Sequence, residues 1–301
     1  MNHDSPLSIG QCASLACLLE ATAPKPGNVH RGADFDDLTY LDFAVSAIAM
    51  APAFEDAAAG AGVGQTVLAA VQAMRRAVDG NTSLGAILLL APLACVPRRD
   101  SLAAGVKQVL ARLSGDDSRQ VYDAIRLAAP GGLGEVAEAD VAGEPPDDLQ
   151  FAMRLAADRD LVARQYVNGF EQVLQAVVPW LAEGLGRQWS LADVIVRTQL
   201  QLMRDFPDSL IARKCGLDVA REAAAQAGKT LEAGEPGDED YYRAITDFDF
   251  WLRADHHRRN PGTSADLLAA GLFAALRDGI IELPVKFYEA RNSQRGVRSH
   301  E

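Results

Sequence analysis

The sequence has little of what marks several common protein classes. Its four cysteines show no C-x-x-C spacing, which argues against a structural zinc site or disulfide framework and favours free thiols in a reducing compartment. Lys and Arg total 29 against 41 Asp and Glu, a formal net charge of −12. A surface for nucleic acid or an anionic membrane would be basic, so neither partner is expected.

Long apolar runs are missing as well. The most apolar stretch, Leu84 to Val96, is interrupted by Pro92 and is shorter than the roughly 20 residues that a bilayer-spanning helix needs. The first residues lack the basic and apolar regions of a secretory signal. We therefore expect a cytoplasmic protein, and the sequence leaves open whether it forms a homo-oligomer.

Strand signals are nearly absent, whereas Ala- and Leu-rich segments with apolar residues at helical spacing recur along the chain. This pattern predicts an all-α fold with one compact multi-helix domain over residues 1–290, and a polar tail over 291–301. Only Leu283–Tyr288 has extended character. The predicted helices are 7–22, 38–52, 63–79, 84–95, 100–113, 117–128, 147–184, 190–204, 208–227, 239–255 and 263–279.

A cationic loop, Pro24–Arg31, separates the first two predicted helices. Its prolines disfavour helix at the residues before them, and Gly27 permits a turn or a close approach to a ligand. The loop carries Lys25, His30 and Arg31, and several aspartates follow it. Cations suit phosphate, and carboxylates suit a hydrated Mg²⁺ that accompanies phosphate. A Pro-Gly turn with solvated charges is the alternative interpretation.

Three further segments follow this loop along the chain, in the order Asn81–Ile87, Asp208–Lys214 and Gly262–Leu268. Together the four segments resemble the triphosphoribosyl-dephospho-CoA synthase family. The resemblance implies an all-helical pentosyltransferase that joins ATP to 3′-dephospho-CoA and releases adenine. The product of such enzymes is the precursor of the prosthetic group of citrate or malonate lyase-type acyl carrier proteins.

The sequence departs from the family pattern at several positions, which is typical of a divergent branch. By spacing, Asp37 keeps the first carboxylate that follows the loop, Thr39 replaces the second, and Phe35 replaces a histidine. Two alternatives therefore stay open. One is a paralogue that uses the same phosphate and magnesium site on another nucleotide or a pterin-type cofactor precursor, and the other is a non-catalytic nucleotide-binding helical protein.

The resemblance also implies a set of site residues. Carboxylates would hold Mg²⁺ between the phosphates of ATP, and one of them would accept the proton of the attacking ribose hydroxyl. Cations and amides would bind the triphosphate and ribose. The expected catalytic residues and metal ligands are Asp37, Asp208 and Asp266, and the expected nucleotide-binding residues are Lys25, Gly27, Asn28, His30, Arg31, Asn81, Thr82, Arg213 and Lys214.

Helix capping competes with a site role for two of these aspartates. Thr263 and Asp266 have the spacing of an N-cap and its N3 acid, and Asp208 follows Pro207 at a predicted helix start. If the chain is an enzyme of this kind, we expect one pocket to bring together Lys25, Arg31, Asp37, Asp208 and Asp266.

Overall fold

The computed structural model describes residues 6–130 and 139–288, and over these residues the predicted all-α fold is confirmed. The described chain contains no strand, only an isolated bridge between His30 and Ala33. Its elements are α1 (Ile9–Thr22), α2 (Tyr40–Ala58), α3 (Val63–Ala77), α4 (Leu84–Ala94), α5 (Leu102–Ala111), α6 (Gly115–Ala128), α7 (Leu149–Ala156), α8 (Leu161–Asn168), a π-helical turn η1 (Val173–Val177), α9 (Val178–Gly186), α10 (Leu191–Asp205), α11 (Ser209–Cys215), α12 (Leu217–Glu232), α13 (Glu239–Arg253) and α14 (Gly262–Arg277).

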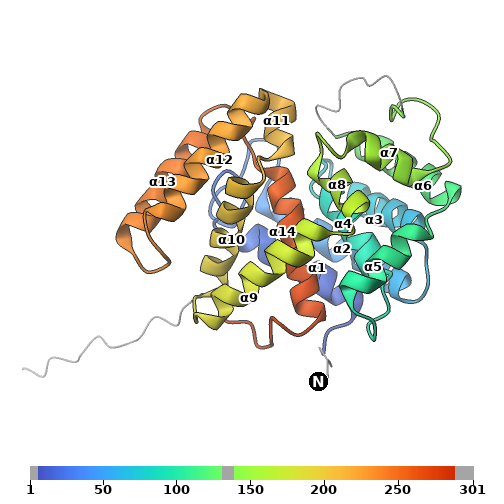
Figure 1. Cartoon of the computed structure of the whole chain (residues 1–301), viewed down its shortest axis with the longest axis horizontal. Helices are drawn as coiled ribbons and strands as arrows, with labels where there is room; N and C mark the ends of the chain where they lie inside the picture. The colour runs from blue at the N-terminus through green and yellow to red at the C-terminus, as the bar shows by residue number, and fades with distance from the viewer. Residues whose placement is uncertain (1–5, 131–138, 289–301) are drawn as a thin grey trace, which may run out of the picture.

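Helix α14 runs through the middle of the molecule. Helices α10 to α13 lie on one side of it and α3 to α8 on the other, and its direct packing partners include α1, α4, α8, α9, α10 and α11 (Figure 1). A helix surrounded in this way must be apolar on most of its faces. The chain meets this requirement, because ten consecutive residues of α14, Leu267–Leu276, are all buried.

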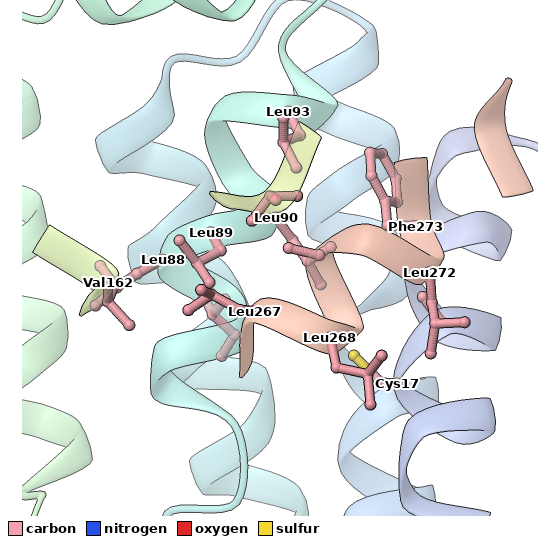
Figure 2. Packing of buried hydrophobic residues seen from close by; sticks show 14 of the residues in the cluster. Cys17, Leu88, Leu89, Leu90, Leu93, Val162, Leu267, Leu268, Leu272 and Phe273 are labelled. Carbon is pink, nitrogen blue, oxygen red and sulfur yellow. The ribbon is translucent and has the colours of Figure 1, made fainter. Parts of the chain in front are cut away.

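Helix α4 is the second buried helix, and it packs directly on α14. Leu89 and Leu90 are fully buried, and they lie in the same cluster as Leu268 and Phe273 of α14 and Cys17 of α1 (Figure 2). Fully burying a Leu or Phe side chain stabilises the fold by about 1.5–3 kcal/mol. Helices α4 and α14 are therefore held firmly against each other.

Two predicted helices are wrong as single elements. The segment 147–184 is divided into α7, α8, η1 and α9, because Asp160 caps α8 with its side chain and Gly169 ends that helix at φ 72°. The segment 208–227 is divided into α11 and α12 at Gly216, whose φ is 95°. A left-handed φ suits glycine, which has no Cβ, and it interrupts a helix.

The extended character of Leu283–Tyr288 does not lead to a strand in the described chain. Instead, the carbonyl oxygens of Lys286 and Phe287 accept hydrogen bonds from the backbone N–H groups of Leu191 and Ala192. Two of the unpaired donors at the start of α10 are satisfied in this way.

The predicted polar tail, 291–301, lies outside the described residues, and the domain limits stay a prediction. All four cysteines are free thiols, two of them buried and two half-buried. Within the described ranges no helix combines the length and apolarity needed to cross a membrane.

Candidate functional site

A large pocket opens where α4, α8, α11 and α14 meet the end of α1. Its volume is about 1560 Å³, above the roughly 300–1,000 Å³ of a typical small-molecule site. Seven of the residues expected at the site line it, namely Asn28, Asp37, Asn81, Thr82, Arg213, Lys214 and Asp266. The other five, Lys25, Gly27, His30, Arg31 and Asp208, are not part of its described lining, so the predicted convergence is partial.

Asp266 lies on the pocket floor, where α14 crosses the start of α4. Its carboxylate accepts a hydrogen bond from the backbone N–H of Ala86. A Cβ at Gly85 would overlap that carboxylate, so only glycine permits this approach. The N-cap residue of α4, Ser83, makes no side-chain cap bond. Asp266 therefore satisfies an unpaired donor of another helix.

The alternative in which Asp266 caps its own helix is wrong. Helix α14 starts after Pro261, and its N-cap makes no side-chain hydrogen bond. Thr263 instead accepts a hydrogen bond from Ser209 Oγ at 3.0 Å.

The carboxyl of Asp266 is in an unusually unfavourable place for a negative charge. Burial raises its pKa well above the ordinary value, the nearby carboxylates of Glu20 and Asp208 raise it further, and the hydrogen bond from Ala86 lowers it. No cation is paired with Asp266 in the described part of the chain. A ligand cation arriving here would relieve this repulsion.

Asp208 is a cap for two helices. It is 1% exposed, and its Oδ1 accepts the backbone N–H groups of Leu210 and Ile211 at 2.8 and 3.0 Å, at the start of α11. Its Oδ2 accepts the backbone N–H and the hydroxyl of Ser264 at 2.7 and 2.8 Å, at the start of α14. With both oxygens occupied, the capping alternative accounts for this residue, and its expected role as a metal ligand has no support in the geometry.

Lys25 is not part of the described pocket lining and is fully buried. Its Nζ donates to the carbonyl oxygen of Glu20 at 2.7 Å and pairs with Glu20 Oε1 at 2.8 Å. Glu20, in the last turn of α1, lines the pocket with a side chain that is 11% exposed. It precedes the recognisable loop motif, and no spacing in the sequence distinguishes it from other helical glutamates.

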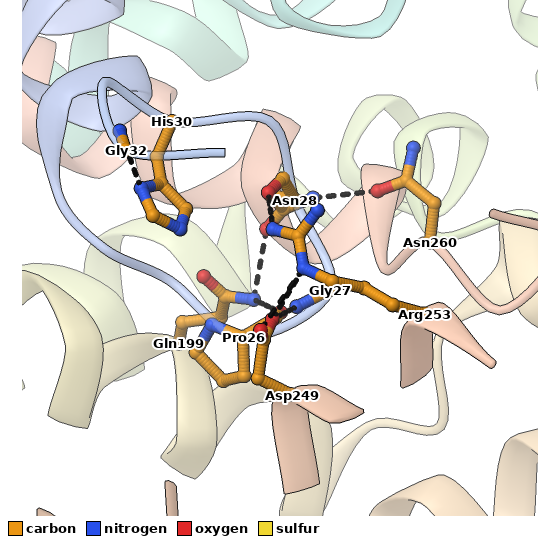
Figure 3. Close-up of polar contacts among 9 residues, drawn as sticks. All are labelled: Pro26, Gly27, Asn28, His30, Gly32, Gln199, Asp249, Arg253 and Asn260. Atoms are coloured by element: carbon orange, nitrogen blue, oxygen red, sulfur yellow. Dashed lines mark hydrogen bonds and ion pairs between the residues drawn. The ribbon is translucent and has the colours of Figure 1, made fainter. Parts of the chain in front are cut away.

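The loop of residues 24–31 is fixed by hydrogen bonds from distant helices (Figure 3). The N–H of Gly27 donates to Asp249 Oδ1 at 2.7 Å. Asn28 Nδ2 donates to Asn260 Oδ1 at 2.7 Å, and Gln199 Nε2 donates to Asn28 Oδ1 at 2.9 Å. Asn28 thus lines the pocket with its amide already fully oriented.

The two remaining polar residues of the loop, His30 and Arg31, make contacts away from the described pocket lining. Burial and the nearby Arg253 guanidinium lower the pKa of His30 to about 4, so its imidazole is neutral at pH 7, and its Nδ1 accepts the N–H of Gly32 at 3.1 Å. Arg31 is exposed, with its guanidinium 5.4 Å from the ring centroid of Tyr288.

The segment before α4 contributes polar groups to one wall. Asn81 Oδ1 accepts the backbone N–H of Leu84 at 3.1 Å, which leaves its amide nitrogen for a ligand. Thr82 Oγ1 donates to Ser46 Oγ at 2.8 Å. Asp37 is exposed at the rim. Thr39, at the position of the second family carboxylate, caps α2.

Another part of the pocket wall carries cations. Arg213 Nη1 lies 3.5 Å from Asp160 Oδ2, and both side chains are partly exposed. Lys214 lines the pocket and forms no ion pair within the described ranges. Arg159 and Arg164 also line this wall. No group of three or more His, Cys, Asp or Glu side chains among the described residues is arranged to hold a metal ion by itself.

Comparisons with known proteins agree on one family. The sequence model for ATP:dephospho-CoA triphosphoribosyl transferase (CitG) matches residues 6–284. A crystal structure of a protein from Archaeoglobus fulgidus, provisionally described as a triphosphoribosyl-dephospho-CoA synthase, matches with a TM-score of 0.61 at 28% identity, covering 78% of this chain and 98% of that one. No curated protein matches the chain.

Proposed function

The chain belongs to the family of ATP:dephospho-CoA triphosphoribosyl transferases, enzymes that move the triphosphoribosyl group of ATP to dephospho-CoA, and we propose that the pocket around Asp266 is where it does so. One observation carries this assignment. Residues from all four family segments line a single pocket although they lie far apart in the sequence. At about 1560 Å³ the pocket has room for two nucleotide substrates. Neither a pterin-type substrate nor a non-catalytic role has support from the comparisons.

The triphosphate is assigned to the wall with Arg213 and Lys214. A guanidinium forms paired hydrogen bonds to phosphate oxygens, and an ammonium supplies a mobile positive charge. Lys214 has no ion pair to give up within the described chain, and Arg213 is only loosely paired with Asp160 at 3.5 Å. Of the four cations expected to bind phosphate, these two line the pocket, whereas Lys25 and Arg31 are not part of its described lining.

The pocket residues fit a Mg²⁺ that arrives with the phosphates. Such an ion keeps several waters and takes one or two carboxylates together with phosphate oxygens, so it needs no cage made only of protein. The fit is supported by the geometry, because Asp266 lines the pocket and has no cation partner among the described residues, and burial together with nearby carboxylates raises its pKa. Asp266 and the rim residue Asp37 would hold the ion, which would neutralise phosphate charge.

The rest of the chemistry requires positioning. Asn28, Asn81 and Thr82 lie in the walls as oriented hydrogen-bonding groups for ribose and nucleobase. Holding the attacking ribose 2′-hydroxyl of dephospho-CoA against C1′ of ATP converts a bimolecular step into an effectively unimolecular one.

The test is the release of adenine from ATP in the presence of Mg²⁺ and dephospho-CoA, followed by chromatography. Arg213→Met and Lys214→Met should raise the KM for ATP, whereas Arg221→Met, at a 64% exposed position of α12, should behave like wild type. If the wild-type protein releases no adenine, the proposed function is wrong.

A further inference from the structure

We propose that Glu20, held in place by the buried Lys25, is the carboxylate that stabilises the positive charge developing at ribose C1′ of ATP. Glu20 is then a catalytic residue and Lys25 a positioning residue that acts through it. This inference rests on the proposed function and assigns a role to a residue that lies outside the expected site set.

The first argument is the unequal burial of the two partners. The Lys25 side chain is 0% exposed, whereas that of Glu20 is 11% exposed and lines the pocket. An ion pair that served stability alone would gain nothing from placing its carboxylate at a cavity wall. Here the cation lies behind the carboxylate, and the negative charge faces the ligand space.

The second argument is that Glu20 is the only hydrogen-bond and ion-pair partner of the Lys25 ammonium among the described residues. Its two acceptors are the carbonyl oxygen and Oε1 of the same residue, at 2.7 and 2.8 Å. The pair therefore fixes both the last turn of α1 and the direction of its carboxylate. A buried lysine is costly unless it is paired with good geometry, so the ammonium of Lys25 requires the carboxylate of Glu20 at this place.

The third argument is the rigidity of the chain that carries Lys25. Pro24 and Pro26 restrict the backbone on both sides of it, and the N–H of Gly27 is held by Asp249 at 2.7 Å. Side chains that hold a catalytic group in place work best on a rigid support. The loop that the sequence marks as cationic thus supplies a fixed counter-charge to the site.

The chemistry requires a negative charge at this point. The bond between C1′ and N9 of adenine breaks with its electron pair leaving on adenine, and a bond forms from C1′ to the 2′-oxygen of the acceptor. The hydroxyl proton is lost from that oxygen, and adenine gains one proton, so the two balance. In between, C1′ carries positive charge, which a fixed carboxylate stabilises without gaining or losing atoms. Asp266 is less suited, because its carboxylate is assigned to the Mg²⁺ that accompanies the phosphates.

The test compares Glu20→Gln with Glu222→Gln, a matched change at an exposed position of α12. Glu20→Gln should lower kcat about a hundred-fold to a thousand-fold with little change in the KM for ATP, because the charge acts in the transition state. Glu222→Gln should behave like wild type.

A binding measurement separates this role from a structural one. Iminoribitol triphosphate carries a ring cation that mimics C1′, and anhydroribitol triphosphate is its neutral match. Wild type should prefer the cationic probe, and Glu20→Gln should lose that preference while its affinity for the neutral probe is unchanged. Equal kcat, or an unchanged preference, in Glu20→Gln would overturn the inference and leave the proposed function standing.

The positioning role of Lys25 is tested by a double-mutant cycle. Lys25→Met leaves an unpaired carboxylate and is expected to lower kcat, whereas adding Lys25→Met to Glu20→Gln should cost no further activity, because both changes remove the same charge effect. The double variant contains no unpaired charge, so it remains informative if either single variant, Glu20→Gln or Lys25→Met, folds poorly. A further loss of kcat in a folded double variant would contradict the positioning role. If wild type releases no adenine, both the function and this inference fail.

Discussion

The loop of residues 24–31 and the pocket floor, where α4 and α14 begin, differ in how their ionisable groups are paired. In the loop, Lys25 has its partner in Glu20, and the N–H of Gly27 has its partner in Asp249. On the floor, Asp266 accepts one backbone N–H and has no cation partner within the described chain. The polar groups of the loop are paired within the protein, whereas the carboxylate on the floor would gain a cation partner only from a ligand. The difference separates residues that build the site from residues that meet the substrate.

The largest effect on stability is expected at Asp208, which caps α11 and α14 together. Asp208→Asn replaces one of the two carboxylate oxygens with an amide NH₂, which faces donors instead of accepting from them. Losing hydrogen bonds to a buried charged group should lower the free energy of unfolding by about 3 kcal/mol. Urea unfolding measures this change.

The same variant decides between the cap and the original expectation of a metal ligand. A cap predicts lost stability with an unchanged dependence of turnover on Mg²⁺. A variant as stable as wild type that no longer responds to Mg²⁺ would restore Asp208 to the metal site.

The largest effect on activity at the floor, apart from Glu20, is expected at Gly85. A Cβ in Gly85→Ala would displace the Asp266 carboxylate, and a displacement of about 1 Å can cost a hundred-fold in turnover. Stability should change little, because the helix propensity of alanine, about 0.5–1 kcal/mol better than that of glycine, offsets the cost of displacing the carboxylate. Steady-state kinetics and thermal melting measure the two effects.

The control for this change is Gly228→Ala in α12. An added Cβ there meets nothing closer than 3.6 Å, so activity should be unchanged and stability should rise slightly. Wild-type turnover in Gly85→Ala would show that the position of Asp266 is not important for the reaction.

The sequence predicts the helical fold well because apolar periodicity is a local signal. It misses the breaks at Gly169 and Gly216 because a single glycine marks a helix end only when tertiary contacts favour that end. It also locates the loop but not its role, since the partner of Lys25 lies in an ordinary helix turn. Gly85 had no explanation in the sequence because its constraint comes from Asp266, far along the chain.

A smaller effect is expected from the raised pKa of Asp266. The folded state keeps a proton that the unfolded chain loses near pH 4, so stability should be full below that pH and fall as the pH rises until the raised pKa is reached. Asp266→Asn should abolish this fall and be more stable than wild type at neutral pH. Urea midpoints over a pH series test this. A parallel pH dependence in both proteins would contradict the assignment.

The smallest effect is expected at His30, and its sign is opposite. Its pKa is lowered to about 4, so the unfolded chain binds a proton below about pH 6.5 that the folded loop does not accept. Stability is therefore full above pH 6.5 and falls as the pH decreases toward 4. Because the ring is only partly buried, we expect a loss of about 1 kcal/mol by pH 4.5. His30→Gln lacks the titrating ring and keeps an acceptor for the N–H of Gly32, so it should resist acid better than wild type while matching it at pH 8. Stability falls with rising pH because of Asp266 and with falling pH because of His30. A urea unfolding series over the whole pH range therefore separates the contribution of the pocket floor from that of the loop. If the stability of His30→Gln falls below pH 6.5 as steeply as that of wild type, the loop does not hold His30 in its neutral form.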